Sequence, residues 1–275
     1  MKSMRPFARG PYFLVILLLV IFSLAPILWV ASTAFKQSNE IYNLAWIPLH
    51  PTLENFKSVL SDNSMLRYFL NTAIIAVCTT IITIFVATFG AYGFSRYGFP
   101  GSRGVLAFIM FTRILPRVTI IIPFYIILRQ LKLLNTFPGL ILVYLTIVMP
   151  VTIWMLKGFF DDIPHEIEEA AAIDGCTSVK MLLQIVLPIC KPGLAAVGMQ
   201  AFILSWNEFL FALIMTNDSA TRPISVGLAF YIDDFGIHWG ELMAASLLMS
   251  IPAMIVFSLS QNMLIKGLSA GAVKG

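Results

Sequence analysis

Long hydrophobic stretches alternate with short polar segments along most of this chain. Each stretch is close to the roughly 20 residues that a helix needs to cross the hydrocarbon core of a bilayer. The pattern predicts six membrane-spanning helices: Tyr12–Phe35, Tyr68–Phe94, Gly104–Leu128, Gly139–Leu156, Leu194–Met215 and Glu241–Ile265. The first run follows three basic residues, as a cleaved secretory signal would, but it is longer than the roughly 7–15 apolar residues of a signal core. We therefore expect it to remain as the first span.

The polar segment Asp161–Gly193, between the fourth and fifth runs, has a pattern of its own. It holds six of the fourteen acidic residues of the chain. Pro164 suits the first position of a helix, and Gly175 suits its end because glycine adopts positive φ without strain. Thr177 or Ser178 can cap a second helix, which we expect to run to about Leu187 and to be closed by the prolines that follow. The segment is either a docking element for a soluble partner or a solvated connecting loop.

The composition favours the membrane interpretation and limits the fold class. The chain is 59% hydrophobic and 12% charged, with a mean hydropathy of +0.87. A soluble domain carries roughly 25% charged residues, so a water-exposed surface of normal size cannot be built here. Because the runs exceed the roughly 10 residues of a barrel strand, we predict an all-α polytopic bundle. No linker or repeat divides the sequence, so residues 1–275 are expected to form one membrane domain.

The distribution of basic residues predicts the orientation. With the N-terminus inside, the cytoplasmic connections carry ten Lys and Arg residues and the external connections carry six. Short cytoplasmic loops are enriched in Lys and Arg, so this bias favours both termini in the cytoplasm. It places Asp161–Gly193 inside and the polar loop Thr216–Gly240 outside.

Several motifs then carry a resemblance to a known family. Glu169-Ala170-Ala171, followed by Gly175, Ile185 and Leu187-Pro188, resembles the EAA motif of permease subunits in bacterial and archaeal ABC importers, although Cys176 stands where the motif usually has alanine. Other stretches resemble the second permease of the maltose-type carbohydrate family: AYGFSRYGFPG (91–101), IPFYIIL (122–128), LLNTFPGLIL (133–142), SWNEFLFAL (205–213) and KGLSAGAVKG (266–275).

The resemblance implies which other subunits the chain works with and what each of them does. It implies a permease of the cytoplasmic membrane that pairs with a homologous permease and moves a sugar delivered by an external solute-binding protein. Two cytoplasmic ATPase subunits would bind ATP and Mg²⁺, since this chain has no Gly-x-x-x-x-Gly-Lys-Ser/Thr loop and is expected to be no enzyme and to hold no cofactor. Glu169 would pair with a basic residue of the ATPase. The residues expected to couple the chain to the ATPase are Glu168, Glu169, Ala170, Ala171, Ile173, Asp174, Gly175 and Met181.

Polar residues within the apolar runs are candidates for the substrate pathway. Arg113 and Arg117 flank Pro116 in the third run, and Asn207 and Glu208 lie in the fifth. A charge inside a span usually faces a cavity or a partner. The alternatives are structural pairing or a place near a membrane face for the arginines, and gating or an interhelical hydrogen bond for Asn207 and Glu208.

The external loop and the remaining polar residues are less specific. Within Thr216–Gly240, we expect five residues to contact the binding protein, although aromatic residues also anchor helices at the membrane interface: Tyr231, Asp233, Asp234, Phe235 and Trp239. The Lys266–Gly275 tail is expected either to insert between the ATPase subunits, as in the related importers, or to anchor the last helix. The three histidines have no ligand spacing and are taken as incidental, the three cysteines as packed thiols, and neither a metal site nor a nucleic-acid surface is expected.

Two other functions are compatible with the sequence. One is a permease of the same family for glycerol 3-phosphate or another polyol derivative. The other is an ion-coupled secondary transporter, which would need buried acidic residues for coupling. Only Glu208 clearly qualifies, and that class leaves the EAA-like segment without a purpose.

Overall fold

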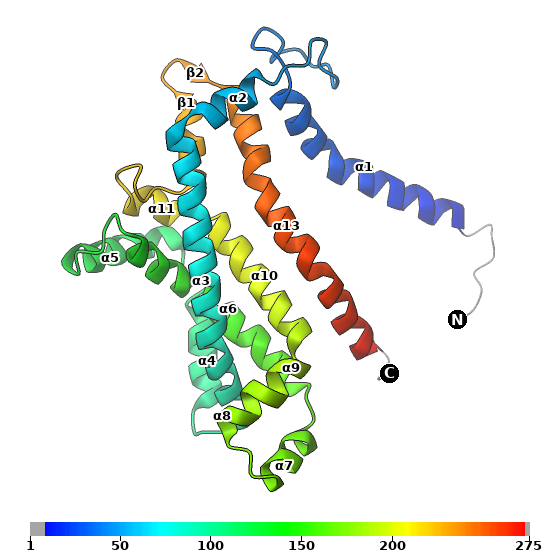
Figure 1. Cartoon of the computed structure of the whole chain (residues 1–275), viewed down its shortest axis with the longest axis vertical. Coiled ribbons are helices and arrows are strands. Elements are labelled where there is room, and N and C mark those ends of the chain that lie inside the picture. Colours follow the sequence, from blue (N-terminus) through cyan, green and yellow to red (C-terminus); the bar gives the residue numbers. More distant parts are fainter. Residues whose placement is uncertain (1–8, 273–275) are drawn as a thin grey trace. The chain divides into compact units, whose positions relative to one another are not determined.

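The computed structural model describes the backbone of residues 9–272 and the side chains of residues 12–261 and 263. The described chain is mostly helical, as the hydrophobic runs predict, with one small hairpin (Figure 1). It consists of two compact units, one formed by residues 1–65 and 228–250 and the other by residues 66–227 and 251–275.

Four helices of the described chain are long and apolar enough to cross a membrane. They are α1 (Arg9–Ala34), α3 (Asn63–Arg96), α6 (Phe137–Asp161) and α13 (Trp239–Ala272). These helices correspond to the first, second, fourth and sixth predicted runs. A bent pair of helical segments, Ser178–Ile189 and Lys191–Trp206, meets at 85° and brings the number to five if the pair counts as one span.

The third predicted run is not one helix, and this prediction was wrong. It forms α4 (Ser102–Phe111) and α5 (Arg117–Gln130), separated by a turn at residues 112–116. Pro116 lacks an N–H and disfavours helical backbone at the residue before it, so the helix stops there. In Figure 1, α5 runs crosswise to α3 and α4.

The fifth predicted run is also interrupted. The helix α10 (Lys191–Trp206) ends before Asn207, and α11 (Leu210–Met215) begins after a break of three residues. The short helices α12 (Ile224–Gly227) and η3 (Leu228–Tyr231) then lead to the strands β1 (Ile232–Asp233) and β2 (Gly236–Ile237). These strands pair antiparallel, with Ile232 opposite Ile237.

The unit of residues 66–227 and 251–275 has two apolar clusters, and α6 contributes to both. One surrounds Leu140 and Tyr144 and includes Phe211 of α11, and the other surrounds Leu156 and Phe160 and includes Leu182. The start of α10 packs closely on α6, since a Cβ added at Gly193 would lie 2.5 Å from the Phe159 ring. The polar segment after α6 is therefore fixed at both ends to a buried helix.

The unit of residues 1–65 and 228–250 contains α1, α2 (Glu54–Ser61), the hairpin and the first turns of α13. In this unit, Asn55 and Lys36 make hydrogen bonds close to the C-terminal end of α1. The amide of Asn55 donates to the carbonyl oxygens of Ala34 and Lys36, at 2.9 Å each. The Lys36 ammonium is buried, donates to the Asn43 carbonyl oxygen at 2.7 Å and lies over the Trp29 ring.

Candidate functional site

The segment after α6 folds as a helix, a glycine turn and a second helix. The first helix, α7 (His165–Ile173), is followed by Asp174 as its C-cap and then by Gly175, which has φ +79°. The amide of Cys176 donates to the Ala171 carbonyl oxygen and the amide of Gly175 to that of Ala172, the paired bonds of a Schellman motif. Thr177 then caps the second helix by accepting from the amide of Lys180. The glycine stop and the threonine cap confirm the local sequence prediction.

The second helix is longer than predicted, because Pro188 does not end it. It comprises α8 (Ser178–Met181), a π-helical turn at Leu182–Val186 and α9 (Leu187–Ile189). In the π-helical turn, the amide of Leu187 reaches back to the carbonyl oxygen of Leu182. Proline has no N–H to donate to the preceding turn, and its ring clashes with the carbonyl group of an ordinary α-helical turn. The wider π-helical turn therefore accommodates Pro188 within the helix. The helix bends only at Cys190, where α10 departs at 85°.

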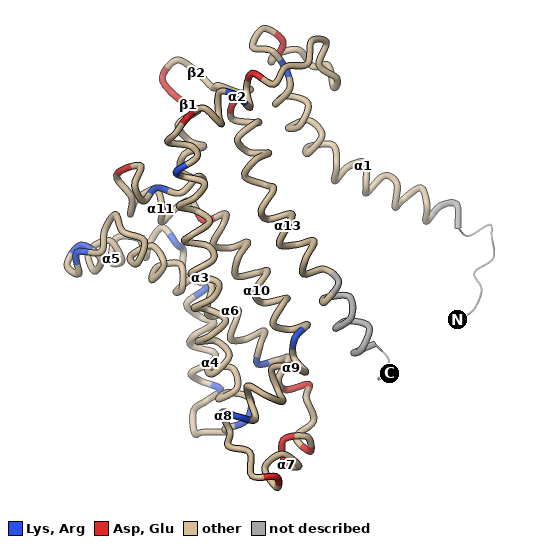
Figure 2. Tube along the Cα trace, in the orientation of Figure 1, with Lys and Arg blue, Asp and Glu red and all other residues tan. Residues whose placement is uncertain are grey.

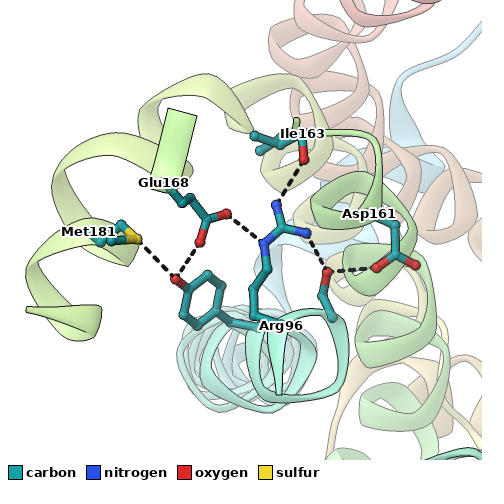
Figure 3. Close-up of polar contacts among 7 residues, drawn as sticks. Arg96, Asp161, Ile163, Glu168 and Met181 are labelled. Atoms are coloured by element: carbon teal, nitrogen blue, oxygen red, sulfur yellow. Dashed lines mark hydrogen bonds and ion pairs between the residues drawn. The ribbon is translucent and has the colours of Figure 1, made fainter. Parts of the chain in front are cut away.

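One face of α7 is held to the end of α3 by a buried ion pair. The Nε of Arg96 lies 2.6 Å from Oε1 of Glu168, and the two side chains are 6% and 9% exposed. The Tyr92 hydroxyl donates to Oε2 of Glu168 at 2.7 Å, and a second nitrogen of Arg96 donates to the Ile163 carbonyl oxygen at 3.0 Å (Figure 3). Every oxygen of the Glu168 carboxylate thus has a partner on α3.

A second polar link joins α3 to the end of α6. The Ser95 hydroxyl donates to Asp161 at 2.6 Å, and Lys157, one turn earlier on α6, pairs with the same carboxylate. Arg96 donates to the Ser95 hydroxyl at 3.1 Å and joins the two links. The ends of α3 and α6 and the start of α7 therefore form one connected polar network.

The opposite face of α7 is open. Glu169, Ala170, Asp174 and Gly175 are exposed, and Ile173 is 88% exposed. Ala171 and Met181 are buried, and so is Glu168, so the residues expected to couple to the ATPase divide between the two faces. Figure 2 shows acidic residues gathered along α7 and basic residues near α8 and α9.

Sequence reasoning missed the partners of Glu168. Tyr92 and Arg96 both lie in the AYGFSRYGFPG stretch, which carried the family resemblance but received no role. The sequence contains a signal for such a pairing. Arg96 ends an apolar run one turn after Tyr92, and a buried guanidinium group needs hydrogen-bond acceptors. Its acceptor is 72 residues away along the chain, and only the fold shows it.

Of the polar pair in the fifth run, Glu208 caps a helix and Asn207 does not. The carboxylate of Glu208 accepts from the amides of Phe211 and Ala212, at 3.1 Å each, and the Ser225 hydroxyl donates to the Glu208 carbonyl oxygen at 2.6 Å. Glu208 is 4% exposed, whereas Asn207 is exposed and donates to the Ile203 carbonyl oxygen. Glu208 thus fixes the break between α10 and α11, and Asn207 projects from it.

Arg113 and Arg117 flank the break between α4 and α5, and both are exposed. Arg113 lies in the turn and donates to the Ile147 carbonyl oxygen of α6 at 2.6 Å. Arg117 is the first residue of α5. The two substrate-pathway pairs predicted from sequence therefore each lie at a helix break.

The hairpin brings together the residues predicted to contact the binding protein. Asp233 accepts from the amides of Phe235 and Gly236, and its second oxygen lies 3.1 Å from Nε2 of His238. These amides and His238 hold the pKa of Asp233 below its usual range. Phe235, at the tip of the turn, is 98% exposed. His238 thus directly follows the hairpin and contacts its turn through Asp233.

Two other members of that group, Tyr231 and Trp239, are partly buried. Trp239 lines an apolar cavity of about 290 Å³ with Trp29 and Tyr42. Burial, with the nearby charges of Asp62 and Glu241, raises the pKa of Tyr231 to about 12. Asp234 is exposed. Among the described side chains, no group of three or more His, Cys, Asp or Glu residues is placed to hold a metal ion.

Residues 80–270 match the family described as "Binding-protein-dependent transport system inner membrane component". The chain belongs to this family. It is 34% identical over 252 residues to the diacetylchitobiose uptake system permease protein DasC of Streptomyces coelicolor, covering 91% of each chain. It is 33% identical over 262 residues to the trehalose/maltose transport system permease protein MalG of Thermococcus litoralis, covering 94% of each.

A solved structure agrees with the fold of this permease. A chain of a bacterial ABC transporter that imports the acidic polysaccharide alginate superposes with a TM-score of 0.81 at 23% identity, covering 95% of this chain and 99% of that one. The family resemblance inferred from the motifs is therefore confirmed, and the protein is a transport permease subunit rather than an enzyme.

Proposed function

We propose that this chain is one of two permease subunits in an ABC importer that moves a sugar across the cytoplasmic membrane. The relatives named above are uptake-system permeases for diacetylchitobiose and for trehalose or maltose. In this proposal a homologous permease forms the other half of the pathway, two ATPase subunits bind ATP and Mg²⁺, and an external binding protein delivers the solute. Both termini lie in the cytoplasm, although residues 1–8 and 273–275, with the end of the Lys266–Gly275 tail, fall outside the described residues.

The proposal counts six crossings, of which two are interrupted. The helices α4 and α5 together form the third, and α10 with α11 forms the fifth. A broken helix is tolerated at membrane depth where it lines a cavity or is buried in protein. The polar residues at the two breaks, Arg113 and Arg117 at one and Asn207 and Glu208 at the other, then belong to the substrate pathway. Substrate sites near the middle of the bilayer are commonly formed by such discontinuous helices.

The observation that carries the proposal is the two-sided character of α7. Its inner face is fixed to α3 by the Arg96–Glu168 pair, and its outer face presents Ile173 at 88% exposure beside the carboxylate of Glu169. A partner protein that covered this face would bury the Ile173 side chain and could place a basic residue beside the Glu169 carboxylate. We assign the outer face to a cleft of the ATPase, with Glu169 beside a basic residue and Ala170 and Gly175 allowing close approach. Closure of the ATPases would then move α7 and, through the pair, α3.

Transport by the complete importer in vesicles tests this function. Wild-type complex should take up the solute only with ATP inside and binding protein outside. Ile173→Glu should reduce uptake at least 10-fold while the complex still assembles in the membrane, because a carboxylate replaces the apolar contact. Ile173→Leu is the matched control and should retain uptake. Transport by this chain without ATPase subunits would contradict the proposal.

An ion-coupled transporter has no support from the geometry of Glu208. Both oxygens of its carboxylate accept backbone N–H groups, and the side chain is buried. Its role in capping α11 accounts for an acidic residue at this depth without a coupling ion.

A further inference from the structure

The break between α4 and α5 carries two positive charges whose role the coupling mechanism does not explain. Arg113 lies in the turn after α4, and Arg117 begins α5 on the other side of Pro116. Both residues are exposed, and four positions separate them along the chain. They occur in an otherwise apolar run of the sequence.

The contact of Arg113 fixes its depth relative to α6. Its guanidinium donates to the Ile147 carbonyl oxygen at 2.6 Å, and Ile147 is near the middle of the 25-residue helix α6. At about 1.5 Å rise per residue, this oxygen lies roughly 15 Å from one end of the helix and roughly 21 Å from the other. If α6 crosses the bilayer, the Arg113 charge sits near its midplane, too deep for contact with lipid headgroups.

The described residues provide no adequate counter-charge. Their ion pairs within 4.0 Å are Arg96–Glu168, Lys157–Asp161, His50–Glu40 and His238–Asp233, none of which includes Arg113 or Arg117. Glu208, at the break between α10 and α11, is the one acidic residue in the fifth apolar run of the sequence. This residue is 4% exposed, and its carboxylate already accepts hydrogen bonds from two backbone amides. With Glu208 ionised, the group keeps one net positive charge.

We propose that Arg113 and Arg117 bind an anionic group of the transported solute, a sugar or polyol that carries a carboxylate, sulfonate or phosphate. This inference rests on the proposed import function and names the substrate class. A charge at mid-depth is costly unless it faces a polar cavity or a partner of opposite sign. The guanidinium group matches the two oxygens of such an anion with parallel N–H donors. A neutral sugar would accept hydrogen bonds but leave the net charge uncompensated.

The charge of the natural solute tests the proposal directly. Source cells and a strain that lacks this chain are given the same complex carbohydrate extract, and the compounds removed from the medium are compared by mass spectrometry. A compound that only the intact strain removes should carry an anionic group. Removal of neutral sugars alone would overturn the inference and leave the import function standing. No difference between the strains would contradict the import function itself.

Variants of the assembled importer test the two residues. Arg113→Gln and Arg117→Gln should each raise the KM for uptake of that compound at least 10-fold, while Arg117→Lys should recover only part of the loss, because it restores the charge without the paired N–H donors. Arg129→Gln is the matched control, since it removes an exposed arginine from the last turn of α5 and should leave the KM unchanged.

Two further measurements separate a solute site from other anions. The partner permease should copurify with both Gln variants at the wild-type ratio, and its loss would assign the arginines to a carboxylate of that subunit. The KM effect should persist in vesicles of phosphatidylcholine alone. If it appears only with phosphatidylglycerol present, the arginines bind lipid and the inference is wrong.

Discussion

Arg96 at the end of α3 and Glu168 in the first turns of α7 form a buried ion pair with 2.6 Å between Nε and Oε1. The pair joins a long apolar helix to a short polar one, and the Tyr92 hydroxyl supplies a third partner. A charged pair that is more than nine-tenths buried resists separation, because breaking it leaves an unpaired charge out of water. In the proposed mechanism, α3 and α7 therefore move together when an ATPase moves α7.

Breaking this pair should loosen α7 and uncouple transport. Removing one partner of a buried pair costs about 3–5 kcal/mol. Arg96→Met and Glu168→Gln should each raise the maleimide reactivity of the half-buried Cys176 and lower ATP-dependent uptake at least 10-fold. The measurement is made with Cys78 and Cys190 replaced by alanine.

The double variant Arg96→Met/Glu168→Leu is the informative control for the pair. It leaves no unpaired charge, so Cys176 should be better protected than in either single variant. If the single variants leave both reactivity and uptake at wild-type levels, the pair does not hold α7.

Gly175 should be sensitive to substitution for conformational reasons alone. It has φ +79°, and a Cβ added there would meet nothing within 4 Å. Gly175→Ala should therefore destabilise the turn by about 1–2 kcal/mol through backbone strain, and Gly175→Asn by less, since asparagine tolerates this region better. Gly175→Pro, which cannot adopt positive φ, should abolish uptake and stimulated ATP hydrolysis while membrane insertion remains intact.

Hydrogen exchange of α7 and the uptake rate of the three variants provide the measurement. The order of damage should be Pro, then Ala, then Asn. Equal damage from Ala and Asn would show that close packing, and not φ, restricts this position.

Substitution of Glu208 should lower the stability of the protein, whereas substitution of the neighbouring Asn207 should change uptake alone. Glu208→Ala removes the acceptor for two backbone amides and should lower stability by about 0.5–2 kcal/mol, as the loss of a helix cap does. Asn207→Ala changes an exposed side chain, so its effect on stability should stay within about 0.5 kcal/mol. If Asn207 lines the pathway, its loss raises the KM for uptake without changing the thermal transition of the complex. An unchanged KM would remove Asn207 from the pathway.

The hairpin should lose order in acid. The amides of Phe235 and Gly236, with His238, stabilise the ionised form of Asp233 and lower its pKa. A carboxyl with a depressed pKa contributes its stabilisation fully above its unfolded value of about 3.9 and loses it as the pH falls through the folded value. Exchange protection of the Phe235 and Gly236 amides, corrected for intrinsic rates, should therefore fall below about pH 4. Asp233→Asn should show no such dependence, and an identical acid transition in both proteins would rule out Asp233 as its cause.

The sequence by itself determined the class of the protein and much of its local structure. Four of the six apolar runs form long helices near their predicted bounds, because an uninterrupted apolar run leaves a chain in lipid little alternative to a helix. Gly175 and Thr177 set the turn after α7 through their own backbone and side-chain preferences, which need no distant residue. The EAA-like motif and the other family stretches indicate the family without the tertiary structure.

The tertiary structure decided which residues of each helix are buried and with which distant residues they pair. Arg96 and Glu168 are 72 residues apart, so their pairing depends on how α3 and α7 meet rather than on any local pattern. Hydropathy also could not separate one span from two helices at Pro116, since the apolar run continues on both sides of this proline. The depth of Arg113 followed only from its contact with Ile147 on α6. Local preferences fix where helices begin and end, whereas burial and pairing depend on neighbours that the linear order does not specify.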